Sequence, residues 1–291
     1  NHLKNTIMKH IIALSVLLAT SVVNNHVYAS SFGVKNTEEG IAAVDNSARS
    51  VEAFNALKTV GNVKVNFTQS ATYSVDIVEA EGQNGAVKCD VVNGILTISD
   101  NGKPSESATV NVCGPTLMKL EIEDNSSFST KKLCCNALEI ECSDNANTTI
   151  EGLGCHTLKV DMEGNSMLNL DSVRCDRAEM DKEGNSSLTA TMQAETADIE
   201  EAGNGMSTIK ILCNTLNAEN SGLAKMNIEC SVTDINIENT GNGSVNASVS
   251  CNKVNAENSG NGNVNLDGST KKFKSSNKAK INAKSLKVYN N

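Results

Sequence analysis

The chain has 291 residues, contains no Trp and only 3% aromatic residues, and carries a formal net charge of −9. A compact globule of this size normally fills part of its core with aromatic rings, so the composition favours a narrow interior of aliphatic side chains, Met and Cys. The acidic balance argues against nucleic-acid binding over most of the surface, because attraction to phosphate requires basic patches.

Residues 1–29 have the organisation of a secretory signal peptide. A basic start at Lys9 precedes an apolar run from Ile11 to Val23, which is too short to span a membrane comfortably, and the small residue Ala29 suits a cleavage site. No later segment is apolar enough for a transmembrane helix. We therefore expect an exported chain, in the periplasm, on the cell surface or secreted, in which residues 30–53 form a linker.

Residues 54–115 read as an N-terminal β cap. The stretches "FNALKTVGNVKVNFTQSATYSVDIV" and "AVKCDVVNGILTIS" alternate apolar and polar residues with the period of a strand, and they carry turn signals at Gly61-Asn62 and Asn93-Gly94. An open strand edge invites pairing with other chains. We expect this segment to pair with the first repeat and cover its edge.

Residues 116–283 contain nine similar units, two of which read "INIENTGNGSVNA" and "VNAENSGNGNVNL". The spacing between unit starts is 20 residues three times and then 19 residues five times. The units start at Met118, Leu138, Leu158, Ala178, Ala197, Leu216, Ile235, Val254 and Phe273. A fixed period of this length indicates a stack of structural repeats.

Each unit has the same internal pattern. An alternating stretch such as Leu158–Met162 is followed by a turn signal, Gly164-Asn165 in this unit and Asp-Asn in the earliest ones, and then by a second alternating stretch. Gly, Asn and Asp tolerate the positive φ of such turns, and their density disfavours helices. The pattern predicts an all-β fold, a parallel β-helix with 19–20-residue rungs. An up-and-down sandwich is the alternative, although hairpins give no reason for a fixed unit length.

Three rows of residues are expected to point inward. The first row is Met118, Leu138, Leu158, Leu216, Ile235, Val254 and Phe273. The second row is Leu120, Ile140, Val160, Met180, Ile199 and Ile237. The third row changes from Ile122, Cys142 and Met162 to Asn220, Asn239, Asn258 and Asn277. We interpret the last four as an internal ladder whose amides hydrogen-bond from rung to rung.

The order of several motifs resembles a known family. "FNALKTVGNVKVNFTQS", "NGILTIS", "VNVCGPTLMKLEIEDNSS", the recurring "SGNG" and the terminal "LKVY" are similar to the "putative auto-transporter adhesin, head GIN domain" family over about Phe54 to Tyr289. The resemblance implies a right-handed, single-stranded parallel β-helix, ending in a strand or tail at 284–291, and a secreted or envelope location. It brings no ligand or active site. This chain departs from the family in its extra cysteines and its Asp-Asn turns.

One outward row is acidic in every unit from the first to the eighth. It consists of Glu121, Glu141, Asp161, Asp181, Glu200, Glu219, Glu238 and Glu257. Stacked strands would place neighbouring carboxylates about 4.8 Å apart, and the repulsion should raise several pKa values. The row is a candidate surface for a cation, Ca²⁺ being the one cofactor considered, or for a partner; it is otherwise a solvated face that opposes aggregation.

The adjacent row mixes signs, with Lys119, Glu139 and Lys159, so Lys could neutralise the early rungs instead. The repeats also lack the Gly-Gly-x-Gly-x-Asp calcium pattern of other β-rolls. We therefore predict no dedicated metal site.

The ten cysteines recur with the repeat. Cys135, Cys155 and Cys175 occupy equivalent positions, and Cys213 and Cys251 fall at the matching corner of later rungs. A spacing of 20 residues is not that of zinc ligands. Exported proteins form disulfides, yet side chains stacked directly in parallel do not easily reach disulfide geometry. A buried row of thiols and a set of disulfides both remain open.

Seven lysines and no acidic residue lie between Thr270 and Asn291. We interpret them as a solvated end that keeps the fold soluble, with an anionic-surface patch as the alternative.

No catalytic residues are predicted. His156 is the one histidine after residue 29, and it adjoins Cys155, whose side chain should point to the opposite face of the strand. Nearly minimal rungs leave no room for catalytic loops. The sequence favours a non-enzymatic, exported surface or envelope protein that binds a glycan, a protein or an envelope component. A periplasmic structural scaffold and a carbohydrate-active β-helix enzyme are the alternatives.

Overall fold

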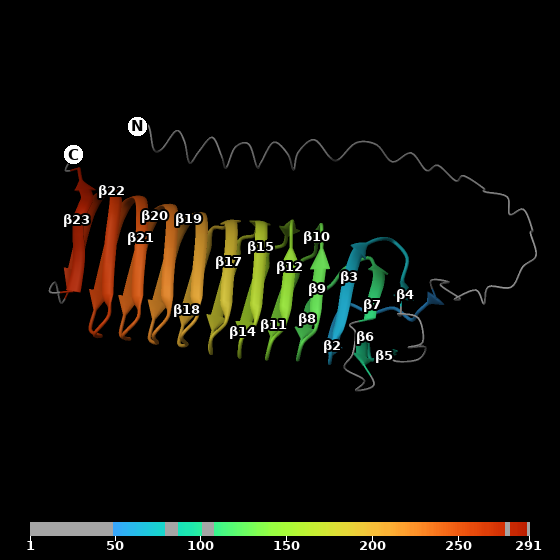
Figure 1. Cartoon of the computed structure of the whole chain (residues 1–291). Coiled ribbons are helices and arrows are strands. Elements are labelled where there is room, and N and C mark those ends of the chain that lie inside the picture. The colour runs from blue at the N-terminus through green and yellow to red at the C-terminus, as the bar shows by residue number, and fades with distance from the viewer. Residues whose placement is uncertain (1–48, 79–86, 101–107, 277–279, 290–291) are drawn as a thin grey trace, which may run out of the picture. The chain divides into compact units, whose positions relative to one another are not determined.

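The computed structural model describes residues 49–78, 87–100, 108–276 and 280–289, which all belong to one compact unit, Ala48–Asn291. The expected signal peptide, most of the expected linker and Asn277 lie outside the described residues. The described chain is all-β, and its strands stack in successive coils as a parallel β-solenoid (Figure 1). This confirms the fold class predicted from the repeat.

The N-terminal strands cover one end of the coil. They are β1 (Arg49–Ser50), β2 (Ala56–Val60), β3 (Val63–Gln69), β4 (Ser74–Val78), β5 (Val87–Val92), β6 (Ile95–Asp100) and β7 (Ala108–Gly114).

Strands β2 and β3 form a rung of their own. They pair in parallel with β8 (Lys119–Ile122) and β9 (Ser127–Thr130) on one side, and with β6 and β7 on the other. From β2 the chain therefore runs one layer inside the stack, turns outward, and returns past this rung. Antiparallel pairings of β1 with β4, of β4 with β7 and of β5 with β6 complete this end.

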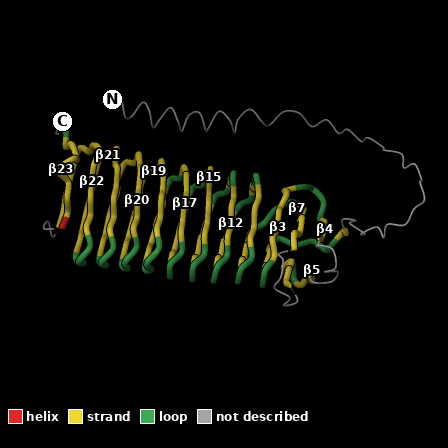
Figure 2. Tube along the Cα trace, viewed as in Figure 1, coloured by secondary structure: helices red, strands yellow, loops and turns green. Residues whose placement is uncertain are grey.

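The remaining strands build the coil, with short strands in the early rungs and long ones later (Figure 2). The early strands are β10 (Leu133–Cys134), β11 (Ala137–Cys142), β12 (Asn147–Ile150), β13 (Leu153–Gly154), β14 (Thr157–Met162), β15 (Met167–Arg174), β16 (Arg177–Lys182), β17 (Ser187–Gln193) and β18 (Thr196–Glu201). The later strands are β19 (Met206–Asn220), β20 (Lys225–Asn239), β21 (Ser244–Asn258), β22 (Asn263–Ser276) and β23 (Ile281–Val288).

Consecutive rungs pair in parallel and in register, as Leu138 with Leu158 and Leu158 with Ala178. Parallel pairing excludes the up-and-down sandwich. The change from 20-residue to 19-residue rungs occurs between β15 and β17: Leu170 lies opposite Ala190, but Val173 lies opposite Met192. One residue is lost at that corner, and the register resumes beyond it.

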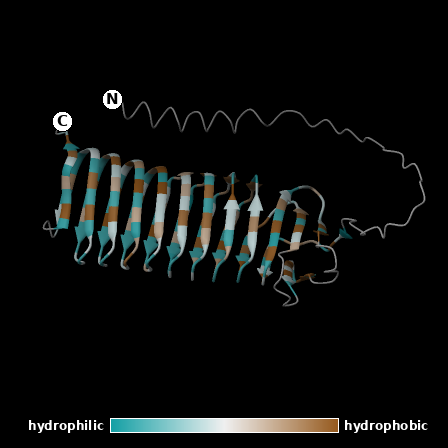
Figure 3. Cartoon of the chain, viewed as in Figure 1, coloured by the Kyte–Doolittle hydropathy of each residue, from teal (hydrophilic) through white to brown (hydrophobic). Residues whose placement is uncertain are grey.

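The core is a continuous column of mostly aliphatic side chains. The strands around it alternate between hydrophobic and hydrophilic residues (Figure 3). The second predicted row is confirmed, because all six of its members are at most 2% exposed. The first row is wrong at Met118, which is 45% exposed, while Leu117 is fully buried in this rung. Met118 precedes β8, where the chain is still entering the rung. Phe273, close to the open end, is only partly buried.

The turns are of two kinds. Positive φ is confirmed in the 20-residue rungs, at Asp124 (59°), Asp144 (58°), Gly164 (68°) and Gly184 (67°). It is wrong for the later rungs, where Gly203 has no positive φ. A Cβ on Gly203 would lie 1.9 Å from the carbonyl oxygen of Gly184 in the rung before. Close stacking of turns, not backbone handedness, requires glycine there.

The internal Asn row is buried as predicted, with Asn220, Asn239 and Asn258 at 0% exposure, but its hydrogen bonds differ. Asn220 Nδ2 donates to the Ala224 carbonyl (3.0 Å), and Asn258 Nδ2 donates to the carbonyl of Gly262 (2.9 Å). Asn239 donates along the stack to Asn258 Oδ1 (3.1 Å), and Asn258 Nδ2 also reaches the Lys280 carbonyl of the next rung (3.2 Å). The row chiefly satisfies turn carbonyls four residues ahead, which in the later rungs face the interior.

A buried ion pair lies where the third row changes from apolar residues to Asn. Lys182 is 3% exposed and Glu201 1%, and Lys182 Nζ lies 3.8 Å from Glu201 Oε2. Lys182 Nζ also donates to the Ser186 carbonyl (2.9 Å), the same four-residue contact that the asparagines make. Burial lowers the pKa of Lys182 and raises that of Glu201. Sequence reasoning missed this pair.

Candidate functional site: the acidic column

The eight acidic residues of the outward row form one column on the surface. Strand register places each carboxylate beside the next, through β8, β11, β14, β16, β18, β19, β20 and β21. We call these residues, Glu121, Glu141, Asp161, Asp181, Glu200, Glu219, Glu238 and Glu257, the acidic column. Side chains of a strand alternate between faces, so Glu141 points outward because Ile140 and Cys142 are buried on either side of it.

Lysines neutralise the first part of the column. Lys119 Nζ lies 3.0 Å from Glu121 and 2.8 Å from Glu141, and Lys58 Nζ lies 3.1 Å from Glu121. Burial alone would raise the pKa of Glu121, but hydrogen bonds from the two lysines hold it below its ordinary value. Lys159 similarly lies 3.0 Å from Asp161. The lysines of the neighbouring mixed-sign row thus neutralise the carboxylates of the early rungs, which was one of the two possibilities predicted from the sequence.

Further along the column, burial and repulsion act in the same direction on the carboxylates. Burial, together with the charges of Glu200 and Asp161, raises the pKa of Asp181. Burial and the charges of Glu238 and Glu200 raise the pKa of Glu219. The expectation of raised pKa values therefore holds for Asp181 and Glu219 and is wrong for Glu121.

Three shallow depressions lie along the column. The first, of about 440 Å³, is lined by seven carboxylates: Glu121, Glu123, Glu141, Asp161, Glu163, Asp181 and Glu183. The next, of about 450 Å³, lies around Asp181, Glu200 and Glu219. The third, of about 590 Å³, lies in the later rungs between Glu219, Glu238 and Glu257 and the parallel row Asn217, Asn236 and Asn255.

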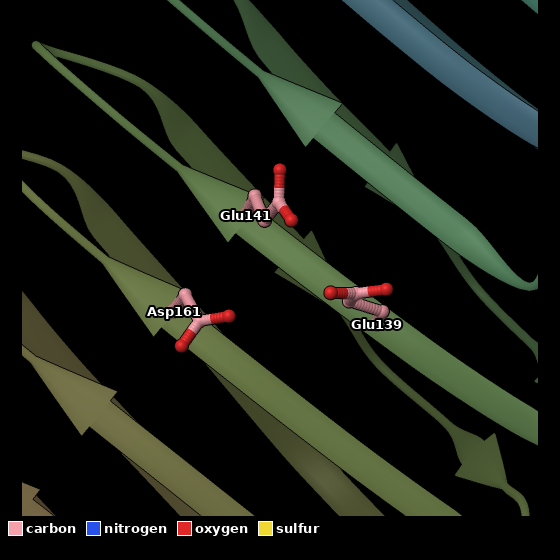
Figure 4. Close-up of side chains that lie close together, drawn as sticks. All are labelled: Glu139, Glu141 and Asp161. Atoms are coloured by element: carbon pink, nitrogen blue, oxygen red, sulfur yellow. The ribbon is translucent and has the colours of Figure 1, made fainter.

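One cluster has the spacing of cation ligands. One carboxylate oxygen each from Glu139, Glu141 and Asp161 lies within 4.8 Å of the others (Figure 4). Oxygen ligands of this kind suit Ca²⁺. Lys119 bonds to Glu141 and Lys159 to Asp161, so a cation would have to displace two ammonium groups from these carboxylates.

An amide row accompanies the later half of the acidic column. Asn236 Nδ2 donates to Asn217 Oδ1, and Asn255 Nδ2 to Asn236 Oδ1, both over 2.7 Å. The Asn ladder predicted from the sequence lies inside the coil, and this outward amide row was not predicted. The sequence did contain a signal: an Asn stands two positions before the Glu in "LNAEN", "INIEN" and "VNAEN". Residues two apart on a strand share a face, so this Asn points outward with the Glu. Each amide retains one N–H that could donate a hydrogen bond to a hydroxyl-rich ligand.

The cysteine–histidine pair has no catalytic geometry. His156 Nδ1 lies 2.7 Å from Asp176 Oδ2, with both side chains largely exposed, whereas Cys155 packs against the core. At this corner between β13 and β14 the thiol and the imidazole therefore do not meet. Within the described ranges, no helix is long and apolar enough to cross a membrane.

The uniform coil and its unbroken polar rows define a repeat protein with an extended surface and short, regular turns. The chain belongs to the "putative auto-transporter adhesin, head GIN domain" family, whose sequence profile matches residues 53–212. Among curated proteins, none matches this chain significantly.

Solved structures show the same fold. A putative adhesin from Parabacteroides distasonis is 18% identical, with a TM-score of 0.69, over 76% of this chain and 95% of its own. A putative adhesin from Parabacteroides merdae is also 18% identical, with a TM-score of 0.65, over 76% and 94%. A putative lipid binding protein from Parabacteroides distasonis is 14% identical, with a TM-score of 0.65, over 76% and 96%. At these identities the likeness concerns the fold alone.

Proposed function

We propose that this chain is an exported, non-enzymatic binding module that acts on the cell surface or in the cell envelope. Its membership of an adhesin family supports this. The observation that carries the proposal is the acidic column, eight carboxylates in register along a coil. Repeated identical contacts add by multivalency even when each is weak.

The second half of the column is the better binding surface. Among the described residues Glu219, Glu238 and Glu257 form no ion pair like those of Glu121, although Lys253 and Lys274 line the same depression. Their neighbouring charges favour a basic protein surface or a bridging divalent cation. The adjacent amides suit the hydroxyl groups of a glycan. A ligand spanning several rungs would contact both rows at once.

Two measurements test the proposal. Protease treatment of intact cells, followed by antibody detection, should remove the protein; protection until the outer membrane is opened would favour a periplasmic scaffold instead. The purified chain should then bind one or more members of a panel of glycans and matrix proteins, with and without Ca²⁺. The triple variant E219Q/E238Q/E257Q should lose at least tenfold in affinity.

The matched control for that variant is K210Q/E229Q. This exposed ion pair (3.4 Å) lies on β19 and β20 but outside the acidic column. Equal binding by the triple variant and the wild type would remove the acidic column from the proposal. Turnover of any panel glycan would contradict a non-enzymatic role.

A further inference from the structure

Three cysteines stack at one corner of the coil on consecutive rungs. Cys135, Cys155 and Cys175 directly follow or end the corner segments of β10, β13 and β15, which pair in register. Their backbone N–H groups continue the ladder: Cys135 donates to the Gly154 carbonyl and Cys155 to that of Arg174, each over 3.0 Å. We call these three residues the thiol column.

The thiols contact one another. The Cys155 side chain hydrogen-bonds to both Cys135 and Cys175, which raises the pKa of Cys155 and lowers that of the two flanking thiols. Cys155 is thus the central thiol of the three, with one cysteine on each adjacent rung. Cys175 is 6% exposed, whereas Cys135 and Cys155 are half-buried and pack against the core, so the column is sheltered yet reachable from solvent.

The spacing selects the coordination number. Neighbouring strands lie about 4.8 Å apart, and two collinear metal–sulfur bonds of about 2.3 Å span nearly the same distance. Cys135 and Cys175 are two strands apart, roughly 10 Å, which is too far for one ion to bind all three thiolates. A tetrahedral zinc site is excluded on the same ground.

We propose that Cys155, together with Cys135 or Cys175, binds one soft monovalent d¹⁰ cation of the Cu(I) or Ag(I) class between two adjacent rungs. Thiolates select such ions over hard cations. On binding, the thiols of Cys155 and of its partner each release a proton to solvent, and two metal–sulfur bonds form without any change of oxidation state. This site is independent of the acidic column and of the proposed binding function.

The chain supplies its own control. Cys213 occupies the same corner, but the neighbouring rungs carry Ala194 and Val232 at this position, so it has no thiol directly above or below it. Cys213 therefore matches Cys155 in setting but lacks a partner for two-coordinate binding.

The test is titration of the reduced full chain with Cu(I), held at low free concentration by bicinchoninate under nitrogen, and read as loss of the coloured complex. We expect the wild type and C213S to take up the same amount. C155S should bind one equivalent less, or at least tenfold more weakly. C135S and C175S should each retain the site, because either flanking thiol suffices, whereas C135S/C175S should lose it.

Loss of uptake in C213S equal to that in C155S would overturn the proposal, as would wild-type uptake by C155S or by C135S/C175S. X-ray absorption of the loaded protein provides a second readout. Two sulfur neighbours per copper support the site, and three or four contradict it.

Discussion

At the scale of single residues, the same carboxylate has opposite energetic consequences at different rungs. Glu121 lies between two lysines and titrates below its ordinary pKa, while Asp181 lies between Asp161 and Glu200 and titrates above it. The ionised form of Glu121 therefore stabilises the fold and that of Asp181 destabilises it.

Neutralising the two residues should change stability in opposite directions. At pH 7, D181N should raise the free energy of unfolding by about 0.5 kcal/mol, and E121Q should lower it by a similar amount, since both sites are partly solvated. The folded pKa of Asp181 is raised, so the gain should vanish as pH falls below its unfolded value of 3.8. That of Glu121 is lowered, so the loss should also vanish in acid. Urea denaturation at several pH values measures both; effects of equal sign would contradict the assignment.

The buried ion pair is the second feature at this scale. Removing one partner leaves an uncompensated charge in the core, whereas replacing both with apolar residues is often neutral or favourable. Met162 already fills the equivalent position one rung before Lys182. We expect E201M to lose about 3–5 kcal/mol of stability and K182M/E201M to recover most of it.

The pH dependence of this pair has a definite sign. Because burial raises the pKa of Glu201 above 4.5, ionising it in the fold costs stability as pH rises through and beyond that value. The stability of the wild type relative to K182M/E201M should therefore decrease from acid to neutral pH. A constant difference, measured by denaturant titration, would show that Glu201 stays ionised in both states.

At the scale of elements, the turn and the inward residue beside it vary together. The first three rungs have a positive-φ turn and carry Ile122, Cys142 or Met162 inside, and the last rungs carry Asn with turn glycines stacked almost in contact. The buried pair lies between them: Lys182 still accompanies a positive-φ turn at Gly184, and Glu201 accompanies Gly203, which has none. An inward carbonyl in the second kind of turn needs a donor, and Asn supplies it.

Stacked glycines should tolerate no side chain. We expect G203A to destabilise the fold by about 2–4 kcal/mol, because its Cβ would overlap the Gly184 carbonyl and force two rungs apart. G154A is the matched control: its Cβ would meet Cys134 Sγ at an ordinary 3.7 Å. Thermal unfolding of both variants measures the difference, and equal losses would contradict the stacking explanation.

The repeat period and side-chain parity were sufficient to predict the coil, its second apolar row and the acidic column. Parity could not predict hydrogen-bond partners, so the buried asparagines were expected to bond along the stack. Lys182 and Glu201 occupy inward positions of the repeat, but their burial was not predicted because charged residues are rarely buried. Met118 has inward parity by sequence but precedes the point at which its strand begins.

At the scale of the whole described unit, charge is distributed unevenly along the coil. The ion pairs of the described residues lie between Lys58 and Glu229, whereas the last two strands carry the exposed lysines Lys271, Lys272, Lys274, Lys284 and Lys287. Within the described ranges, none of these five forms an ion pair. The terminal strand β23 pairs only with β22, and Val288 and Tyr289 are exposed beside its open edge.

Lysines on an open edge oppose pairing with a second chain. Changing all five to Gln should promote end-to-end association, visible in sedimentation velocity as dimers or longer species at concentrations where the wild type is monomeric. Changing all five to Arg keeps the charge and should preserve the monomer. Association of the Arg variant would show that positive charge is not what prevents association at this edge.

The single-residue loss between β15 and β17 has a consequence for how such a chain can change its length. From that corner as far as β22 every row repeats at 19 residues, so excising Asn239–Glu257 would join Glu238 to Asn258 with the apolar, amide and carboxylate rows all still aligned. A cut across the corner would join a 20-residue rung to a 19-residue one and misalign them. The later rungs are thus interchangeable modules, and recombination within them alters the reach of the surface without redesigning its chemistry.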